Sequence, residues 1–133
     1  MVKLSSLRRD PALERSGVWV SYPFGGRFKV GRSNAPEFEA ACRKLLEPHV
    51  ARVRTGAMSH SERAQVLLPA FVRFCLFDWE IDGDDGKPTP FSREEAEKQL
   101  RAPELSDLLE WLFAQSDNAA LFRAQAQNEA LGN

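Results

Sequence analysis

The chain has 133 residues, of which 43% are hydrophobic and 28% are charged, and its formal net charge is −1. This length predicts one domain with a substantial core, and the composition excludes a disordered or fibrous chain. The longest apolar run, residues 66–77, is interrupted by Arg73 and is too short to span a membrane. The first residues lack the apolar stretch of a secretory signal, so we expect a cytoplasmic protein with reduced cysteines.

The small net charge conceals an asymmetry along the chain. Residues 1–77 carry 13 Lys and Arg against 6 Asp and Glu, whereas residues 78–133 carry 5 against 13. Either the two halves fold together and partly compensate each other, or the subunit stacks head to tail as a homo-oligomer. The arginines are scattered and no RNA-binding aromatic signature is present, so we expect no nucleic-acid partner.

The N-terminal part predicts a polar leader followed by a β-hairpin. Residues 1–16 form the leader, with one helical turn expected around residues 11–14. Residues 17–22 then alternate as a strand, Gly25 and Gly26 lie in the turn, and residues 27–32 alternate apolar and basic as a return strand. An isolated hairpin is marginally stable in water, so it must pack on the helices or pair with another chain.

The remainder of the chain predicts helices. Asn34 and Pro36 begin the first, which fades near residue 54, and a strongly apolar helix over 61–78 is either the central core helix or an interface. Ser92 caps a short charged helix, another follows from residue 103, and the last covers roughly 118–131. The expected fold is therefore mainly α (α+β): one domain, 1–133, of about five helices, with the hairpin at 17–32 and the helical part at 34–131.

An acidic turn separates the basic half from the acidic half. Asp78, Glu80 and Asp82, followed by Gly83, match the first positions of a calcium-binding loop. The twelfth position is Thr89, where a bidentate glutamate is expected. We therefore interpret the segment as a solvated turn and predict no bound calcium.

Other chemistry is also disfavoured by spacing. Cys42, His49, His60 and Cys75 are possible zinc ligands, but structural zinc sites use ligands paired two to four residues apart. Both cysteines fall on predicted buried faces, which disfavours a nucleophilic thiolate. No phosphate-binding loop, nucleophile elbow or His-Glu-x-x-His pair occurs. We predict a protein that is not an enzyme and has no cofactor; a small metal- or nucleotide-dependent enzyme is the disfavoured alternative.

The chain has more aromatic residues than a simple core requires. Trp79 ends the apolar run, Phe91 follows two prolines, and Trp111 lies off the apolar stripe of its helix. These three, together with Phe122 of the last predicted helix, either pack within the chain or serve as anchors for a protein partner, where tryptophan is enriched. They are the candidate partner-binding residues.

The order of these elements resembles the tail assembly chaperones of long-tailed, siphophage-type bacteriophages. The likeness covers roughly residues 15–130. It comprises the Gly-Val-Trp-Val strand at 17–20, the basic return strand leading to Asn34, and the apolar helix ending in Asp78-Trp79. The segment 79–92, with its acidic turn and Pro-Thr-Pro-Phe-Ser, is the most specific part.

The resemblance implies a small, mostly helical protein of the infected bacterial cytoplasm that is absent from the mature virion. It implies binding to the phage tape measure protein, which is kept soluble, and recruitment of tail tube protein. It implies no catalytic residue. A structural minor tail or tail completion protein of the virion is the alternative function.

Overall fold

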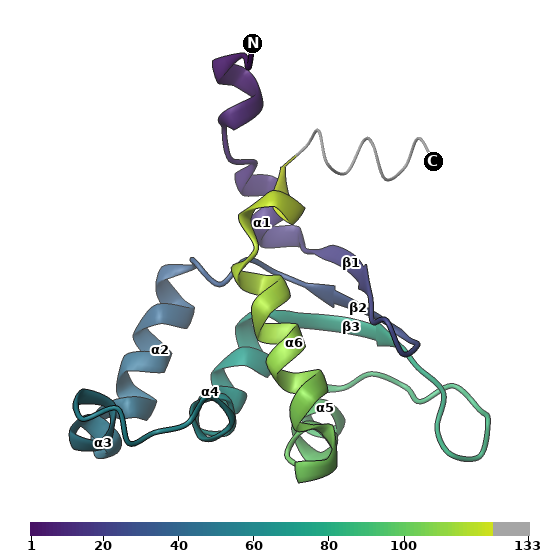
Figure 1. Ribbon diagram of the computed structural model, residues 1–133. Coiled ribbons are helices and arrows are strands. Elements are labelled where there is room, and N and C mark those ends of the chain that lie inside the picture. Colours follow the sequence, from purple (N-terminus) through teal and green to yellow (C-terminus); the bar gives the residue numbers. More distant parts are fainter. Residues whose placement is uncertain (124–133) are drawn as a thin grey trace.

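The computed structural model describes residues 1–123 as a small antiparallel sheet packed against helices (Figure 1). The strands run in the order β1-β2-β3, and their bounds are β1 (Val18–Ser21), β2 (Arg27–Val30) and β3 (Leu76–Glu80). The α-helices are α1 (Pro11–Ser16), α2 (Pro36–Leu46), α3 (Val50–Arg54), α4 (His60–Phe74), α5 (Arg93–Leu100) and α6 (Ser106–Asp117). Short 3-10 turns are η1 (Leu4–Leu7), η2 (Glu47–His49), η3 (Pro103–Leu105) and η4 (Ala119–Phe122).

The predicted fold class, mainly α with an N-terminal β-hairpin, is confirmed. β1 and β2 form the hairpin, and Val18 and Val20 are buried on the face that meets the helices. Helix α4 is the centre of the helical layer, because it contacts α2, α5, α6 and β3. Its buried side chains, Leu68, Phe71 and Val72, therefore explain why this helix is apolar around most of its circumference.

The end of the apolar run differs from the prediction. Residues 61–78 were expected to be one helix, but α4 ends at Phe74 and residues 76–80 form β3, the third strand of the sheet. The strand pairs with β2 so that Arg27 lies opposite Glu80, and Lys29 lies opposite Asp78. The hairpin is thus completed by a strand from the middle of the chain, which supplies the hydrogen-bonding partner that a two-stranded ribbon lacks.

An irregularity in the β2–β3 register positions Phe77. The pairing shifts between Lys29 and Val30, so that Val30 lies opposite Leu76 and the residue between Leu76 and Asp78 is left unpaired. The Phe77 ring lies against Gly17 and Gly31, where an added Cβ would come within 2.6 Å of the ring at either glycine. The two glycines therefore make room for an aromatic ring over the sheet.

The other helix boundaries agree in part with the predictions. Ser92 caps α5 by accepting from the Glu95 N–H at 3.0 Å. The first helix of the helical part is broken at η2, and its cap residue is Ala35 rather than Asn34, whose side chain instead contacts Glu14. The predicted last helix, 118–131, begins as the turn η4, and its remainder lies outside the described residues. Within residues 1–123, no helix is long and apolar enough to cross a membrane.

Candidate functional site

Trp79 and Phe91 pack within the chain. Trp79 is only 5% exposed, and its ring meets the Phe91 ring edge to face with centroids 5.2 Å apart. The indole N–H donates to the Thr89 carbonyl at 2.8 Å. Trp79 therefore joins β3 to the chain that returns from the acidic turn, and it is not exposed as an anchor.

Phe122 and Trp111 also make contacts within the chain. Phe122 is 1% exposed and belongs to the core. Trp111 is half-buried and packs edge to face on Tyr22, with ring centroids 4.9 Å apart, and on Phe28 at 6.4 Å. Trp111 packs at the junction between α6 and the sheet, which explains its position off the apolar stripe of α6. The periodicity of the sequence does not show this junction.

Phe24 is an exposed aromatic residue that was not among the candidates predicted from the sequence. It is 88% exposed at the tip of the hairpin, and its ring lies 5.5 Å from that of Tyr22. A tight turn needs no large apolar side chain. A phenylalanine between Pro23 and Gly25, in a predicted turn, was therefore the feature of the sequence that could have indicated an exposed aromatic residue.

A groove lies between α4 and α6. Each helix contributes residues at the spacing i, i+3, i+4, i+7, which places them on one face. The cavity measures about 330 Å³, and its lining residues are His60, Arg63, Ala64 and Leu67 of α4 with Glu110, Phe113, Ala114 and Asp117 of α6.

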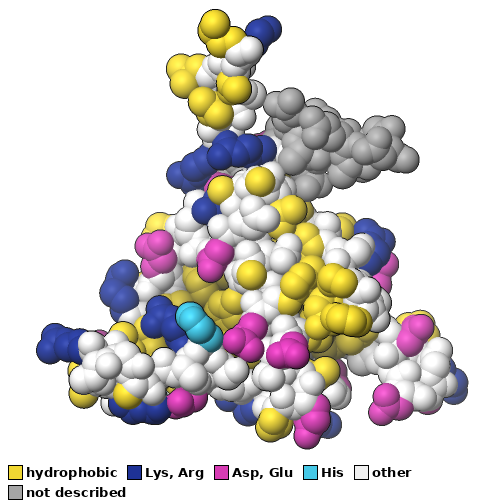
Figure 2. Space-filling model, viewed as in Figure 1, with side chains coloured by type: hydrophobic (Ala, Val, Ile, Leu, Met, Phe, Trp, Pro, Cys, Tyr) yellow, Lys and Arg dark blue, Asp and Glu magenta, His cyan; other side chains and the backbone are white. Residues whose placement is uncertain are grey.

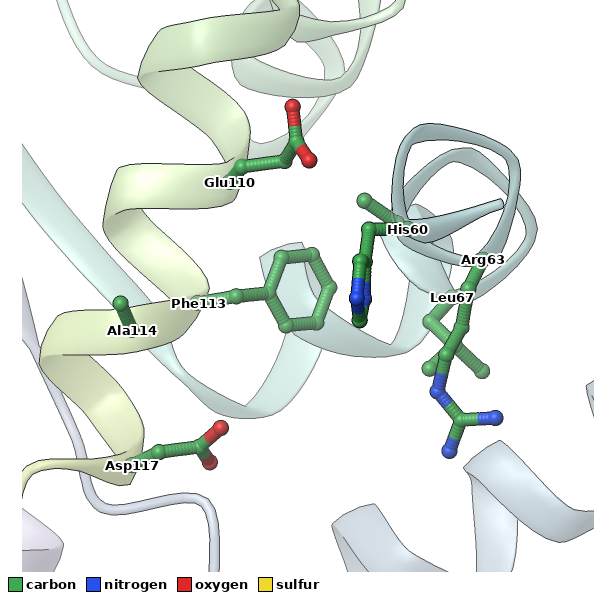
Figure 3. A pocket seen from close by; sticks show the side chains of 8 residues that line it. His60, Arg63, Leu67, Glu110, Phe113, Ala114 and Asp117 are labelled. Atoms are coloured by element: carbon green, nitrogen blue, oxygen red, sulfur yellow. The ribbon is translucent and has the colours of Figure 1, made fainter. Parts of the chain in front are cut away.

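This groove has an apolar floor and a charged rim. The Phe113 ring stacks on buried Phe71 at 4.3 Å, which fixes it in the wall of the groove. Figure 3 shows the His60 imidazole facing the Phe113 ring, with Glu110, Asp117 and Arg63 around the opening. An apolar floor bordered by charges of both signs suits an amphipathic helix.

A second cavity extends the groove toward α2. It measures about 360 Å³ and shares Arg63, Leu67, Phe113 and Asp117 with the first. Phe38, Cys42 and Leu46 of α2 add to its apolar lining. We call the two cavities together the helix groove. On this face of the molecule, hydrophobic side chains lie exposed among charged ones (Figure 2).

The thiols and the acidic turn were the sequence candidates for chemistry. Burial raises the pKa of Cys42, which lines the helix groove, and raises that of the fully buried Cys75 well above its usual range. Both thiols are therefore protonated at neutral pH, which is unfavourable for a nucleophile or a metal ligand. Among residues 1–123, no group of three or more His, Cys, Asp and Glu side chains could hold a metal ion.

The fold and the groove define a small α+β protein with an apolar, charge-bordered surface between helices. The YdaY prophage protein family matches residues 33–133, which is most of the chain. The chain belongs to this family, and it is a protein of prophage origin. No curated protein and no solved structure matches it.

Proposed function

We propose that this protein is a non-enzymatic tail assembly chaperone whose helix groove holds a helical segment of the phage tape measure protein. In this role it keeps the tape measure protein soluble in the host cytoplasm and helps to recruit tail tube subunits. The observation that carries the proposal is the helix groove, with its apolar floor across α2, α4 and α6. The prophage family and the resemblance of segment 79–92 to such chaperones support it.

The dimensions of the groove suit a helix. The lining residues of α4 run from His60 to Leu67, which corresponds to roughly 10 Å, or two turns, at 1.5 Å per residue. A partner helix with apolar residues at i, i+3, i+4 and i+7 would bury them against Leu67 and Phe113. The α6 rim carries the acidic residues Glu110 and Asp117, and the α4 rim carries the basic residue Arg63. These charges would orient a partner that carries charges beside its apolar stripe.

A bulky charge in the groove tests this proposal. Ala114 is an exposed residue of α6 that lines the groove, so Ala114→Arg should block it without disturbing the core. Ala40→Arg is the matched control, because Ala40 is an exposed helical residue of α2 outside the lining. On co-expression with the tape measure protein of the same prophage, we expect the wild type and Ala40→Arg, but not Ala114→Arg, to yield a soluble complex on gel filtration.

Two outcomes contradict the proposal. An Ala114→Arg variant that solubilises the tape measure protein as well as the wild type does would remove the groove from the interaction. Mass spectrometry of purified particles that finds the protein in fixed proportion to tail subunits would identify the alternative, a structural minor tail or tail completion protein.

A further inference from the structure

Residues 1–8 form an exposed apolar and basic segment, which we call the N-terminal arm. Val2, Leu4 and Leu7 are 68%, 70% and 58% exposed. Lys3 and Arg8 are its charged side chains, and it contains no acidic residue. Figure 1 shows the arm projecting from the body of the protein. Such clustering of exposed apolar side chains is typical of a binding element.

The base of the arm is held by hydrogen bonds. Arg123 donates to the carbonyls of Leu7 and Arg8 at 2.7 and 3.4 Å. Just beyond the arm, Arg9 pairs with buried Glu14 at 2.6 Å. The base of the arm is thus attached to the body, while Val2, Leu4 and Leu7 remain exposed.

A cavity with acidic lining residues, opposite in charge to the N-terminal arm, lies at the end of the sheet away from the arm. It measures about 470 Å³, and we call it the acidic corner; it is lined by Gly26, by residues 79–82 and by residues 88–91. Ile81, Pro90 and Phe91 supply apolar surface, and Glu80 and Asp82 are its ionisable lining residues. The corner thus combines an apolar surface with carboxylates.

The charge of the corner remains negative after its own ion pair is counted. Arg27 donates to Glu80 at 3.0 Å, which compensates that carboxylate. Asp82, Asp84 and Asp85 are exposed in the same turn, with Lys87 as the opposing charge of segment 81–90. A basic apolar segment therefore complements the corner in both respects.

The arm lies far from the acidic corner of its own chain. The arm leaves the body near α1, whereas the loop after β3 lies at the opposite end of the molecule (Figure 1). We propose that the N-terminal arm of one copy docks in the acidic corner of a second copy. Since the two surfaces differ, the contact is head to tail and propagates into a ring or a filament.

The charges also distinguish this contact from the helix groove. The rim of the groove carries Arg63 beside Glu110 and Asp117, and Arg43 and Glu39 continue this mixture toward α2. A basic arm gains less from such a rim than from the acidic corner. Self-assembly and partner binding therefore use separate surfaces, and this inference does not depend on the proposed function.

Two charge-reversal variants test the contact with purified protein alone. The first, Lys3→Glu/Arg8→Glu, reverses the arm, and the second, Asp82→Lys/Asp84→Lys, reverses the corner. We expect sedimentation velocity to show association of the wild type and at least a ~tenfold weaker association of each variant alone. A mixture of the two should associate again, because every arm then meets a corner of opposite charge.

The control variant is Lys44→Glu/Arg54→Glu, which makes the same change of charge at exposed positions on α2 and α3. It should associate as the wild type does. A wild type that stays monomeric at all concentrations, or a mixture that fails to associate, overturns the proposal.

A disulfide trap locates the contact. With Cys42 replaced by serine, a Leu4→Cys variant mixed with a Pro88→Cys variant should form a cross-linked dimer under mild oxidation. Leu4→Cys mixed with Ala114→Cys, which places the thiol in the helix groove, should not. Cross-linking to Ala114→Cys in place of Pro88→Cys would assign the arm to the groove and overturn the assignment to the acidic corner.

Discussion

The indole N–H of Trp79 donates to the main-chain carbonyl of Thr89 across the acidic turn, at 2.8 Å. This contact closes the loop between β3 and the segment that leads to α5. Within the loop, the Gly83 N–H donates to the Lys87 carbonyl at 2.8 Å, and the Thr89 N–H donates to the Ile81 carbonyl at 2.8 Å. Hydrogen bonds between its two sides therefore hold the turn closed.

Replacing Trp79 by phenylalanine should destabilise the protein while leaving an aromatic ring against Phe91. The variant loses the bond to Thr89 and part of a buried ring, so we expect a loss of about 1–3 kcal/mol in the free energy of unfolding. Urea denaturation measures this loss in the free energy of unfolding. Trp19→Phe is the control: Trp19 is partly exposed and contacts the Arg27 guanidinium through its ring, so its loss should be smaller. Equal losses would contradict the role of the indole N–H.

The carboxylate of Glu14 should stabilise the N-terminal part at neutral pH. It is 6% exposed, and hydrogen bonds from Arg9 hold its pKa below the usual 4.5, with Asn34 and Arg32 contributing against the opposing effect of burial. Glu14→Gln should cost about 1.5–3 kcal/mol at pH 7, as expected for hydrogen bonds to a charged group.

The pH dependence of this stabilisation has a definite sign. A carboxyl group with a lowered pKa in the folded state stabilises the fold above pH 4.5, and the stabilisation is lost as the pH falls through the folded-state pKa. The stability difference between the wild type and Glu14→Gln should therefore shrink over the pH range below 4.5. A constant difference across this range would exclude the carboxylate as its source.

Gly17 and Gly56 form a matched pair for backbone strain. Both have positive φ, +88° and +72°, but an added Cβ at Gly17 would lie 2.6 Å from the Phe77 ring, whereas at Gly56 nothing lies within 4 Å. Gly56→Ala should cost about 1 kcal/mol of folding stability from conformational strain. Gly17→Ala should cost about 3 kcal/mol or more, because its combination of φ +88° and ψ 162° is confined to glycine and the ring must move. Similar losses in thermal denaturation would contradict the close packing of Phe77.

The two thiols should differ in reactivity toward an aromatic disulfide reagent. Cys75 is fully buried and its pKa is raised by burial, so it should react only after unfolding. Cys42 is partly exposed in the helix groove and has a raised pKa, so it should react in the folded protein but more slowly than a free thiol. Labelling of Cys42→Ser in the absence and presence of urea isolates Cys75. Rapid labelling of that variant in the folded state would contradict its burial.

Local patterns in the sequence predicted much of the fold correctly. The alternation at 17–32 predicted the hairpin, and Ser92 with Glu95 predicted the start of α5. These elements depend on contacts between residues near one another in the chain, as in a cap or a tight turn. The burial of the candidate partner-binding residues Trp79 and Phe122 was not predicted, because it depends on elements that are distant in the chain.

Local patterns in the sequence were enough to predict a mainly α fold with an N-terminal hairpin, and the change of charge at Asp78 is read directly from the residues. That residues 76–80 form a strand depends on the tertiary structure, because a strand needs a partner and β2 lies far away in the chain. The matching charges of Arg27 with Glu80 and of Lys29 with Asp78 were visible in the sequence, but their pairing depends on the register. The helix groove likewise exists only once α2, α4 and α6 pack, since its lining comes from separate helices.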